Sequence, residues 1–199
     1  MSPELIVFTG PMFGGKTSRL LAAIDRYQYQ KRNILCFKPA VDDRYESNHI
    51  VTHSGLKKDV VLVRSGEDIT NIVNYLTGDE AEPDVIAVDE VFMIPDVADS
   101  LIDLFMRGKT VLASSLQLSY EGLPFGEVQR LLPYATKIEV CPAVCVECNR
   151  DAHYTHRKVE GDETLMVGGG DIYEPLCHKH YKKTGAMKDA RTERKINLR

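Results

Sequence analysis

The fold is decided by one stretch near the start of the chain, residues 5–17, with the sequence LIVFTGPMFGGKT. Its first five residues are apolar and mostly β-branched or aromatic, which predicts a short buried strand. The next eight, Gly10–Thr17, satisfy the pattern G-x-x-x-x-G-K-[ST] and are followed by a predicted helix over residues 17–31. This pattern between a strand and a helix predicts a phosphate-binding loop, and a chance glycine turn is the weaker alternative.

The loop supplies the expected ligands of a nucleoside triphosphate. Glycines let successive backbone N–H groups converge on phosphate oxygens, and the helix N-terminus adds the positive end of its dipole. Lys16 would reach the β- and γ-phosphates, and the Thr17 hydroxyl would bind Mg²⁺, so Mg²⁺ with ATP is the expected cofactor. The predicted nucleotide-binding residues of the loop are Gly10, Pro11, Met12, Phe13, Gly14, Gly15, Lys16 and Thr17.

Strand and helix patterns alternate along the chain after this loop. Further strands are predicted over residues 33–37, 60–63, 85–88 and 110–113, and further helices over 68–76 and 95–107. The polar residues 42–58 between two of these strands indicate a loop or an irregular hairpin. Such alternation predicts an α/β domain with a mostly parallel sheet, which binds ligands at the carboxyl ends of its strands.

Two carboxylates end one of these strands. Asp89 and Glu90 follow the buried run 85–88, so they should lie at the same sheet edge as the phosphate loop. Asp89 suits a magnesium site, and Glu90 could take a proton from water or from a substrate hydroxyl. An acidic pair that caps a helix is the structural alternative. The pair alone leaves hydrolysis and phosphoryl transfer open.

Four of the five cysteines crowd into residues 141–177. Cys145-x-x-Cys148 and Cys177-x-x-His180 have the pair spacing of a structural tetrahedral Zn²⁺ site with no open position. Cys141 and His178 are alternative ligands that do not keep this spacing, and free thiols with surface histidines are the alternative to any metal. Three glycines, residues 168–170, lie between the pairs and could bring backbone close to a ligand or form only a flexible turn.

We expect a nucleotide-binding domain over 1–140, a zinc-binding domain over 141–185 and a disordered tail over 186–199. Composition and charge then exclude some classes of protein. The net charge of −4 argues against a nucleic-acid binder. The sequence contains no run of about twenty apolar residues that could span a membrane, and its start lacks the layout of a signal peptide. A cytoplasmic location is therefore expected.

Several motifs together resemble the type II thymidine kinases, the zinc-containing enzymes of cytosol, bacteria and viruses. The resemblance runs in order over residues 4–182, and it rests on GPMFGGKT at 10–17, KPAVDDRY at 38–45, Asp89-Glu90, PFG at 124–126, AVCVEC at 143–148, YTHR at 154–157 and GGGDIYEPLC at 168–177. It implies transfer of the ATP γ-phosphate to the 5′-hydroxyl of thymidine. It also implies a zinc-anchored lasso loop over the active site, a homotetramer and feedback inhibition by dTTP.

The resemblance also assigns residues. It makes Glu90 the base for the 5′-hydroxyl, and it implies that Asp89 and Thr17 hold the Mg²⁺. Arg44 would bind the phosphates, and Asp42 would bind the sugar. The base would lie among Met12, Leu116, Tyr120, Phe125, Thr155 and Tyr173, with the lasso backbone of Val167, Gly168 and Gly169 hydrogen-bonding the pyrimidine edge. Where the family commonly has Gln, an aromatic residue and Phe, this chain has Phe92, Met93 and Tyr120.

Two other classes of function fit parts of the pattern. An ATPase motor or switch would use Glu90 to activate water and the zinc domain to bind a partner. A nucleic-acid-binding zinc domain with a vestigial phosphate loop is the second, and the acidic charge argues against it.

Overall fold

A parallel sheet forms the centre of the molecule. The computed structural model describes residues 2–41, 49–51, 57–160, 166 and 168–186. Six strands pair in parallel throughout, in the spatial order β5-β2-β6-β7-β1-β8. Their bounds are β1 (Leu5–Gly10), β2 (Ile34–Pro39), β5 (Val61–Val63), β6 (Val85–Val88), β7 (Thr110–Leu116) and β8 (Lys137–Val140). The predicted α/β class with a mostly parallel sheet is confirmed.

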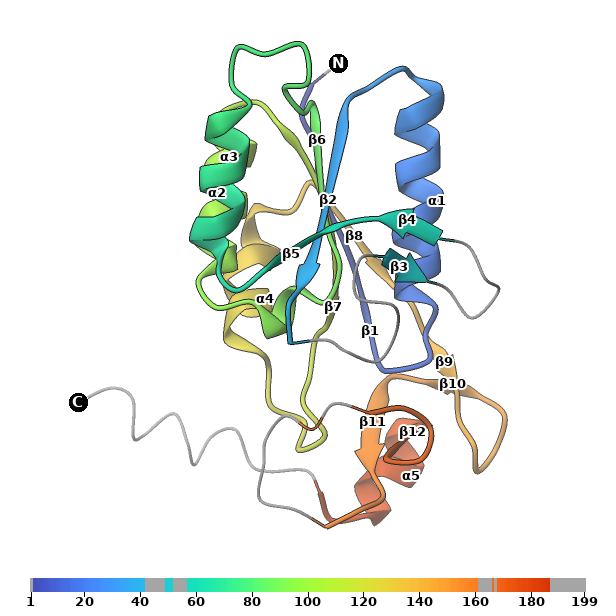
Figure 1. Ribbon diagram of the computed structural model, residues 1–199. Helices are drawn as coiled ribbons and strands as arrows, with labels where there is room; N and C mark the ends of the chain where they lie inside the picture. The colour runs from blue at the N-terminus through green and yellow to red at the C-terminus, as the bar shows by residue number, and fades with distance from the viewer. Residues whose placement is uncertain (1, 42–48, 52–56, 161–165, 167, 187–199) are drawn as a thin grey trace, which may run out of the picture.

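Helices cover both faces of this sheet (Figure 1). One face is covered by α1 (Lys16–Tyr29), and the other by α2 (Gly66–Tyr75), α3 (Val97–Met106) and α4 (Gly126–Leu131). Because successive strand residues point to opposite faces, Leu5 and Val7 pack toward α2 and α3, whereas Ile6 and Phe8 pack toward α1. Two 3₁₀ turns, η1 (Val91–Met93) and η2 (Leu132–Tyr134), complete this part of the chain.

Local sequence explains where several helices begin and end. The Ser65 side chain accepts a hydrogen bond from the Asp68 N–H and caps the start of α2. Gly108 has a φ of 90° directly after the last turn of α3, the left-handed conformation that glycine adopts at helix ends. The predicted helix over 95–107 begins two residues late, at Val97, and the predicted strand over 110–113 continues to Leu116.

The polar stretch between β2 and β5 is described only in part. β3 (His49–Val51) and β4 (Lys57–Asp59) pair antiparallel, as an irregular hairpin would. The predicted substrate residues Asp42 and Arg44 lie outside the described residues, as does Val167.

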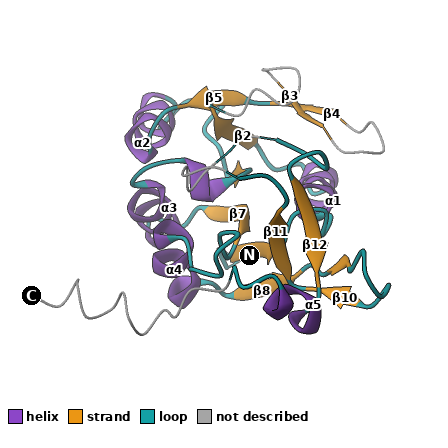
Figure 2. Ribbon diagram, turned by 90° about the horizontal axis from the view of Figure 1, so that it is seen from below, coloured by secondary structure: helices purple, strands orange, loops and turns teal. Residues whose placement is uncertain are grey.

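A small second layer lies beyond the carboxyl ends of the parallel strands (Figures 1 and 2). It contains two antiparallel pairs, β9 (Ala143–Val144) with β10 (Asp151–Ala152), and β11 (Tyr154–Arg157) with β12 (Tyr173–Leu176). The helix α5 (His178–Lys183) follows. We call residues 141–186 the zinc module. Of the predicted tail, only Ala186 is described. No helix among the described residues is long and apolar enough to cross a bilayer.

Backbone contact joins the zinc module to the phosphate loop. The Cys141 N–H donates to the Thr9 carbonyl at 2.7 Å, so the chain continues past β8 alongside the loop. A Cβ atom added to Gly10 or to Gly14 would lie 2.2 Å from the Cys141 carbonyl oxygen. Since real Cβ atoms do not approach backbone so closely, both glycines are required for this packing as well as for the loop's own shape.

We therefore expect Gly14→Ala to destabilise the protein even without nucleotide. The obstacle is backbone that cannot rotate away, and overpacking of this kind costs about 1–3 kcal/mol. The matched control is Gly126→Ala at the first residue of α4, where an added Cβ meets no atom within 4 Å. That change should be neutral or stabilising by about 0.4–1 kcal/mol. Urea unfolding at constant m-value measures both, and equal midpoints for the two variants would contradict the steric argument.

Candidate active site and metal centre

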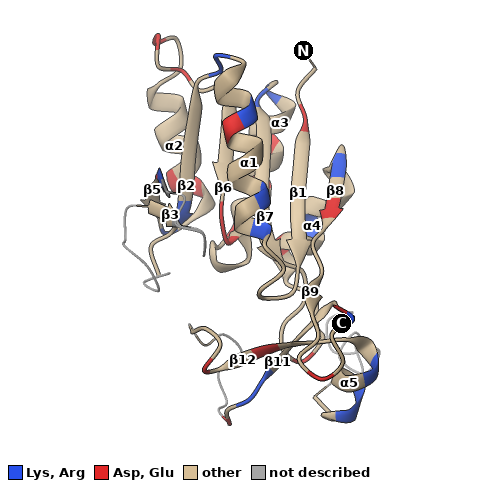
Figure 3. Ribbon diagram, turned by 90° about the vertical axis from the view of Figure 1, so that its right-hand side faces the viewer, with Lys and Arg blue, Asp and Glu red and all other residues tan. Residues whose placement is uncertain are grey.

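The phosphate loop lies at the carboxyl end of β1 and opens into α1. Gly15 precedes the helix with a φ of 72°, and Phe13 also has a positive φ, of 65°. The Lys16 ammonium is buried, and it donates to the Pro11 carbonyl at 2.7 Å, which holds the lysine over its own loop. Figure 3 shows this basic first turn of α1 and the acidic end of β6 at the same edge of the sheet. The predicted loop thus lies between a strand and a helix, where its residues could bind phosphate groups.

Asp89 lies beside the loop, as predicted from its place after β6. Its two carboxylate oxygens are 3.3 and 3.4 Å from the Thr17 hydroxyl, and the Ser114 hydroxyl donates to one of them. Burial, and then the neighbouring Glu90 charge, raise the pKa of Asp89 to about 6. A hydroxyl beside a buried carboxylate, with a second carboxylate next in the chain, fits a divalent cation that offsets the shared negative charge. Thr17 and Asp89 would hold that Mg²⁺.

Glu90 leaves the strand in an unusual backbone conformation. Its φ is 53° and its ψ is 46°, the left-handed region that non-glycine residues rarely adopt. The turn is fixed by hydrogen bonds from the Met93 N–H to the Glu90 carbonyl at 2.9 Å and from the Phe92 N–H to the Ser115 hydroxyl at 3.1 Å. A half-buried Glu90 side chain thereby lines a pocket next to the phosphate loop.

This pocket lies beside Glu90 and is open to solvent on one side. It brings together seven of the residues that the sequence assigned to the substrate: Met12, Leu116, Tyr120, Phe125, Thr155, Gly168 and Tyr173. Its remaining lining residues are Glu90, Phe92, Met93, Leu118, Ser119 and Met166. The walls are mostly apolar and aromatic, with a carboxylate at one position and a few hydroxyl groups, which is typical of a small-molecule site.

Five of these lining residues were not assigned by the sequence, namely Phe92, Met93, Leu118, Ser119 and Met166. Phe92 and Met93 were noted only as departures from a family pattern, although Phe92 packs against Phe125 with ring centroids 4.6 Å apart. Leu118 and Ser119 belong to the loop after β7. Leu116 and Tyr120 were assigned, so an alternation along this loop was the signal that could have included Leu118, and Ser119 is out of phase with it.

Gly168 and Gly169 differ in the structure. Gly168 lines the pocket, but Gly169 does not. The Gly169 N–H donates to the Asp171 carboxylate at 3.1 Å, and its carbonyl accepts from the N–H groups of Ile172 and Tyr173. Neither glycine has a positive φ. The backbone of Gly169 is therefore engaged in a turn of its own loop.

A side chain of the zinc module reaches the phosphate loop. Thr155, on β11, is 4% exposed, and its hydroxyl accepts a hydrogen bond from the Met12 N–H at 3.0 Å. Both residues line the pocket. Because this hydroxyl already accepts from Met12, its own proton can point to an acceptor in the pocket.

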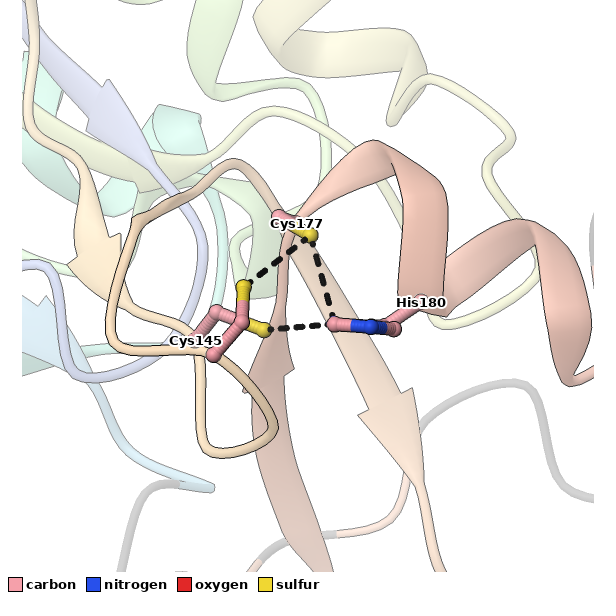
Figure 4. Close-up of side chains that lie close together, drawn as sticks. Cys145, Cys177 and His180 are labelled. Carbon is pink, nitrogen blue, oxygen red and sulfur yellow. Dashed lines mark hydrogen bonds between the residues drawn. The ribbon is translucent and has the colours of Figure 1, made fainter.

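The four predicted zinc ligands converge although they come from two distant segments. Figure 4 labels three of them, Cys145, Cys177 and His180. Their ligand atoms all lie within 4.8 Å of one another. The Cys148 and Cys177 sulfurs are 3.8 Å apart, and His180 Nδ1 is 3.4 Å from the Cys145 sulfur and 3.5 Å from that of Cys177.

These spacings fit a tetrahedral Zn²⁺. Zinc–sulfur bonds of about 2.3 Å and zinc–nitrogen bonds of about 2.0–2.1 Å place tetrahedral ligands about 3.6–3.8 Å apart. The burial of Cys145 acts to raise its thiol pKa, but hydrogen bonds from the Cys177 backbone and from His180 outweigh it and lower the pKa to about 6. The thiolate that results is the ligating form. The alternative ligands Cys141 and His178 are not in the cluster.

We expect one zinc ion per chain, bound through this cluster. Cys148→Ser should lower the zinc content well below one per chain, because an alcohol is a poor substitute for a thiolate ligand. Cys36→Ala is the matched control, since Cys36 is a buried thiol packed against α1 in the sheet domain. Metal analysis of the purified variants measures this. One zinc ion per chain in Cys148→Ser, or a zinc content below one per chain in Cys36→Ala, would contradict the assignment.

Comparisons with known proteins agree with this geometry. The family model described as thymidine kinase matches residues 3–181. A thymidine kinase of Pyrobaculum aerophilum is 35% identical over 184 residues, covering 89% of this chain and 97% of the relative. A thymidine kinase of Thermococcus kodakarensis is also 35% identical over 184 residues, covering 89% of this chain and 93% of the relative. With its phosphate loop, carboxylate-lined pocket and three-cysteine, one-histidine cluster, this chain belongs to the thymidine kinase family, in its zinc-containing type II.

Proposed function

We propose that this protein transfers the γ-phosphate of ATP to the 5′-hydroxyl of thymidine. One observation carries the proposal: Glu90 lines a mostly apolar pocket together with Met12 of the phosphate loop and Thr155 of the zinc module. A carboxylate at the border between a phosphate loop and an apolar pocket suits a base for a substrate hydroxyl. The family relationship supports the same reaction.

The chemistry assigned to this chain's residues is mainly positioning and proton transfer. Glu90 accepts the proton of the 5′-hydroxyl as that oxygen bonds to the γ-phosphorus, and the bond to the β,γ-bridging oxygen breaks to release ADP. Lys16 and the loop N–H groups bind the phosphates. Thr17 and Asp89 would hold the Mg²⁺ of the nucleotide, which would supply charge neutralisation at the phosphates. Arg44 and Asp42 remain our proposed ligands of phosphate and sugar.

The pocket also suits a pyrimidine base. Phe92 and Phe125 offer faces for stacking, and the Thr155 proton and the backbone at Gly168 offer polar contacts. A wrong base edge would leave buried polar groups unpaired, which discriminates strongly. Deoxyuridine lacks only a methyl group, and an apolar pocket rejects such an analogue by no more than about 10–200-fold. We therefore propose that deoxyuridine is a slower substrate.

Feedback by dTTP follows from the same arrangement. A thymidine triphosphate could place its base in the pocket and its phosphates toward the loop, and so exclude thymidine. We propose this inhibition, together with a homotetrameric assembly and a cytoplasmic location, on the support of the type II resemblance.

The experiment that tests the reaction offers the protein ATP, Mg²⁺ and a panel of nucleosides, and separates the monophosphates formed. We expect thymidine monophosphate to form fastest. ATP hydrolysis at the full rate without any nucleoside would instead favour the ATPase alternative.

Glu90→Gln should slow phosphoryl transfer by about 10²–10⁴-fold, because the amide keeps the shape of the side chain but cannot accept a proton. The dissociation constant of a non-hydrolysable ATP analogue should stay close to that of the wild type. Glu67→Gln, on the exposed face of α2, is the control for loss of one carboxylate. A turnover number near the wild-type value in Glu90→Gln would remove Glu90 from the reaction.

The glycines of the lasso give a second test. Gly168 lines the pocket, and a Cβ added there would lie 2.3 Å from the Ile172 Cδ1 atom, whereas a Cβ on Gly169 meets only an Asp171 oxygen at 3.5 Å. We expect Gly168→Val to lower kcat/KM for thymidine by about 10²-fold, the scale of a misplacement near 1 Å. Gly169→Val should cost much less. Equal losses in both variants would indicate that the loop is only a spacer.

A further inference from the structure

The position of Tyr120 is not fixed by the central sheet. Tyr120 lies in the loop that joins β7 to α4, where the isolated bridge between Leu118 and Pro124 is the only strand-like pairing described. Its half-buried ring forms part of the pocket wall. The loop closes its own turn, in which the Ser119 N–H donates to the Leu123 carbonyl at 2.8 Å and the Gly122 N–H to the Ser119 carbonyl at 3.0 Å. Contacts from other segments add to this turn in placing the ring.

Tyr181 of the zinc module contacts the Tyr120 backbone. Its hydroxyl donates to the Tyr120 carbonyl oxygen at 2.6 Å, across 61 residues of sequence. The Tyr181 side chain is fully buried, and it stacks on Tyr154 with ring centroids 4.6 Å apart and an interplanar angle of 9°. Burial raises the Tyr181 pKa to about 12, so the hydroxyl remains a donor at neutral pH.

Tyr181 is also tied to the metal cluster. It follows His180 directly, and the N–H groups of His180 and Tyr181 both donate to the Cys177 carbonyl, at 3.0 and 2.9 Å. The backbone that presents two of the four cluster ligands is thus the backbone that presents the Tyr181 ring. Closure of the cluster and placement of this hydroxyl depend on the same turn at the start of α5.

The Tyr120 side chain has its own contact with the zinc module. The Arg157 guanidinium carbon lies 3.8 Å from the centre of the Tyr120 ring, and Nη2 donates to the Tyr120 hydroxyl at 2.9 Å. That hydroxyl in turn donates to Glu121 at 3.1 Å. Arg157 is 8% exposed and is two residues from Thr155, which also lines the pocket.

We propose that Tyr181 is a positioning residue that couples the metal cluster to nucleoside binding by holding the Tyr120 backbone in the pocket wall. Arg157, at the end of β11, orients the ring of Tyr120 from the same module. The inference rests on the proposed function, because it takes the pocket as the nucleoside site. It predicts that the zinc module sets nucleoside affinity by a direct contact, in addition to closing the lasso.

The test is Tyr181→Phe, which keeps the buried ring and its stacking on Tyr154 but removes the donor to Tyr120. Two matched variants accompany it. Tyr154→Phe removes a hydroxyl from the other ring of the same stack. Tyr27→Phe removes a hydrogen bond of the same length, 2.6 Å to Glu4, on α1 and away from the pocket. The measurements are the thymidine dissociation constant and kcat/KM, the dissociation constant of a non-hydrolysable ATP analogue, zinc content and the urea midpoint.

We expect Tyr181→Phe to weaken thymidine binding about 5–10-fold, the scale of one buried hydrogen bond, with zinc content and ATP-analogue affinity unchanged. Both control variants should bind thymidine as the wild type does. Thymidine affinity in Tyr181→Phe equal to that in Tyr154→Phe would overturn the proposal. A loss of zinc from Tyr181→Phe that parallels the loss of thymidine affinity would also overturn it. The same holds if the urea midpoint falls further in Tyr181→Phe than in Tyr27→Phe, because the hydroxyl would then serve only the stability of the module. Wild-type protein that binds the ATP analogue but no pyrimidine nucleoside would refute the proposed function itself.

Discussion

The contact of the Cys141 backbone with the phosphate loop constrains the rest of the active site. The Cys141 carbonyl occupies the space in which Gly10 and Gly14 would carry a Cβ atom, and its N–H extends the hydrogen bonding of β1 through Thr9. The chain therefore enters the zinc module at the sheet edge where the phosphate loop lies. With the second hydrogen bond, between Met12 and Thr155, the module forms one wall of a pocket that Met12 of the loop also lines. Glycines usually explained by phosphate binding are needed here for chain packing too.

The parts of the site that the sequence predicted are those encoded by short local patterns. The loop Gly10–Thr17, the pair Asp89-Glu90 and the two cysteine pairs each combine spacing with a flanking strand or turn, and the structure brings each set together. The sheet followed from its buried apolar runs. α4 was missed because its six residues are too short to show a helical period, and β8 because it is an edge strand with exposed residues.

The pocket beside Glu90 could not be predicted from periodicity. Its walls come from the 3₁₀ turn after β6, the loop after β7 and strand β11, which lie together only in three dimensions. Resemblance to a family supplied most of these residues. Of the glycines it assigned, Gly168 lines the pocket, and Gly169 makes hydrogen bonds within its own loop. Asp42, Arg44 and Val167 lie outside the described part of the chain, so their roles stay predictions.

The zinc module has too little apolar contact to hold this geometry on its own. Its buried cluster consists of six residues, Ala143, Cys145, Ala152, Leu176, Cys177 and Tyr181, and two of these are metal ligands. A core of this size cannot offset the conformational entropy of about forty ordered residues. A metal that joins the β9–β10 turn to the start of α5 supplies free energy of folding that side-chain burial does not. The precision of the pocket wall then depends on metal–ligand bonds and on single hydrogen bonds to neighbouring loops.

Two adjacent carboxylates acquire separate roles through the backbone between them. On a continuing strand, Asp89 and Glu90 would point to opposite faces of the sheet, and one would be buried under a helix. The left-handed conformation of Glu90 ends the strand instead, so that Asp89 faces Thr17 while Glu90 enters the pocket. This conformation is costly for a residue with a Cβ and persists only where the surroundings impose it. They do so through the fully buried Val91 and the bond from Phe92 to Ser115. The strain lies at the residue whose direction decides whether a second carboxylate enters the pocket beside the phosphate loop.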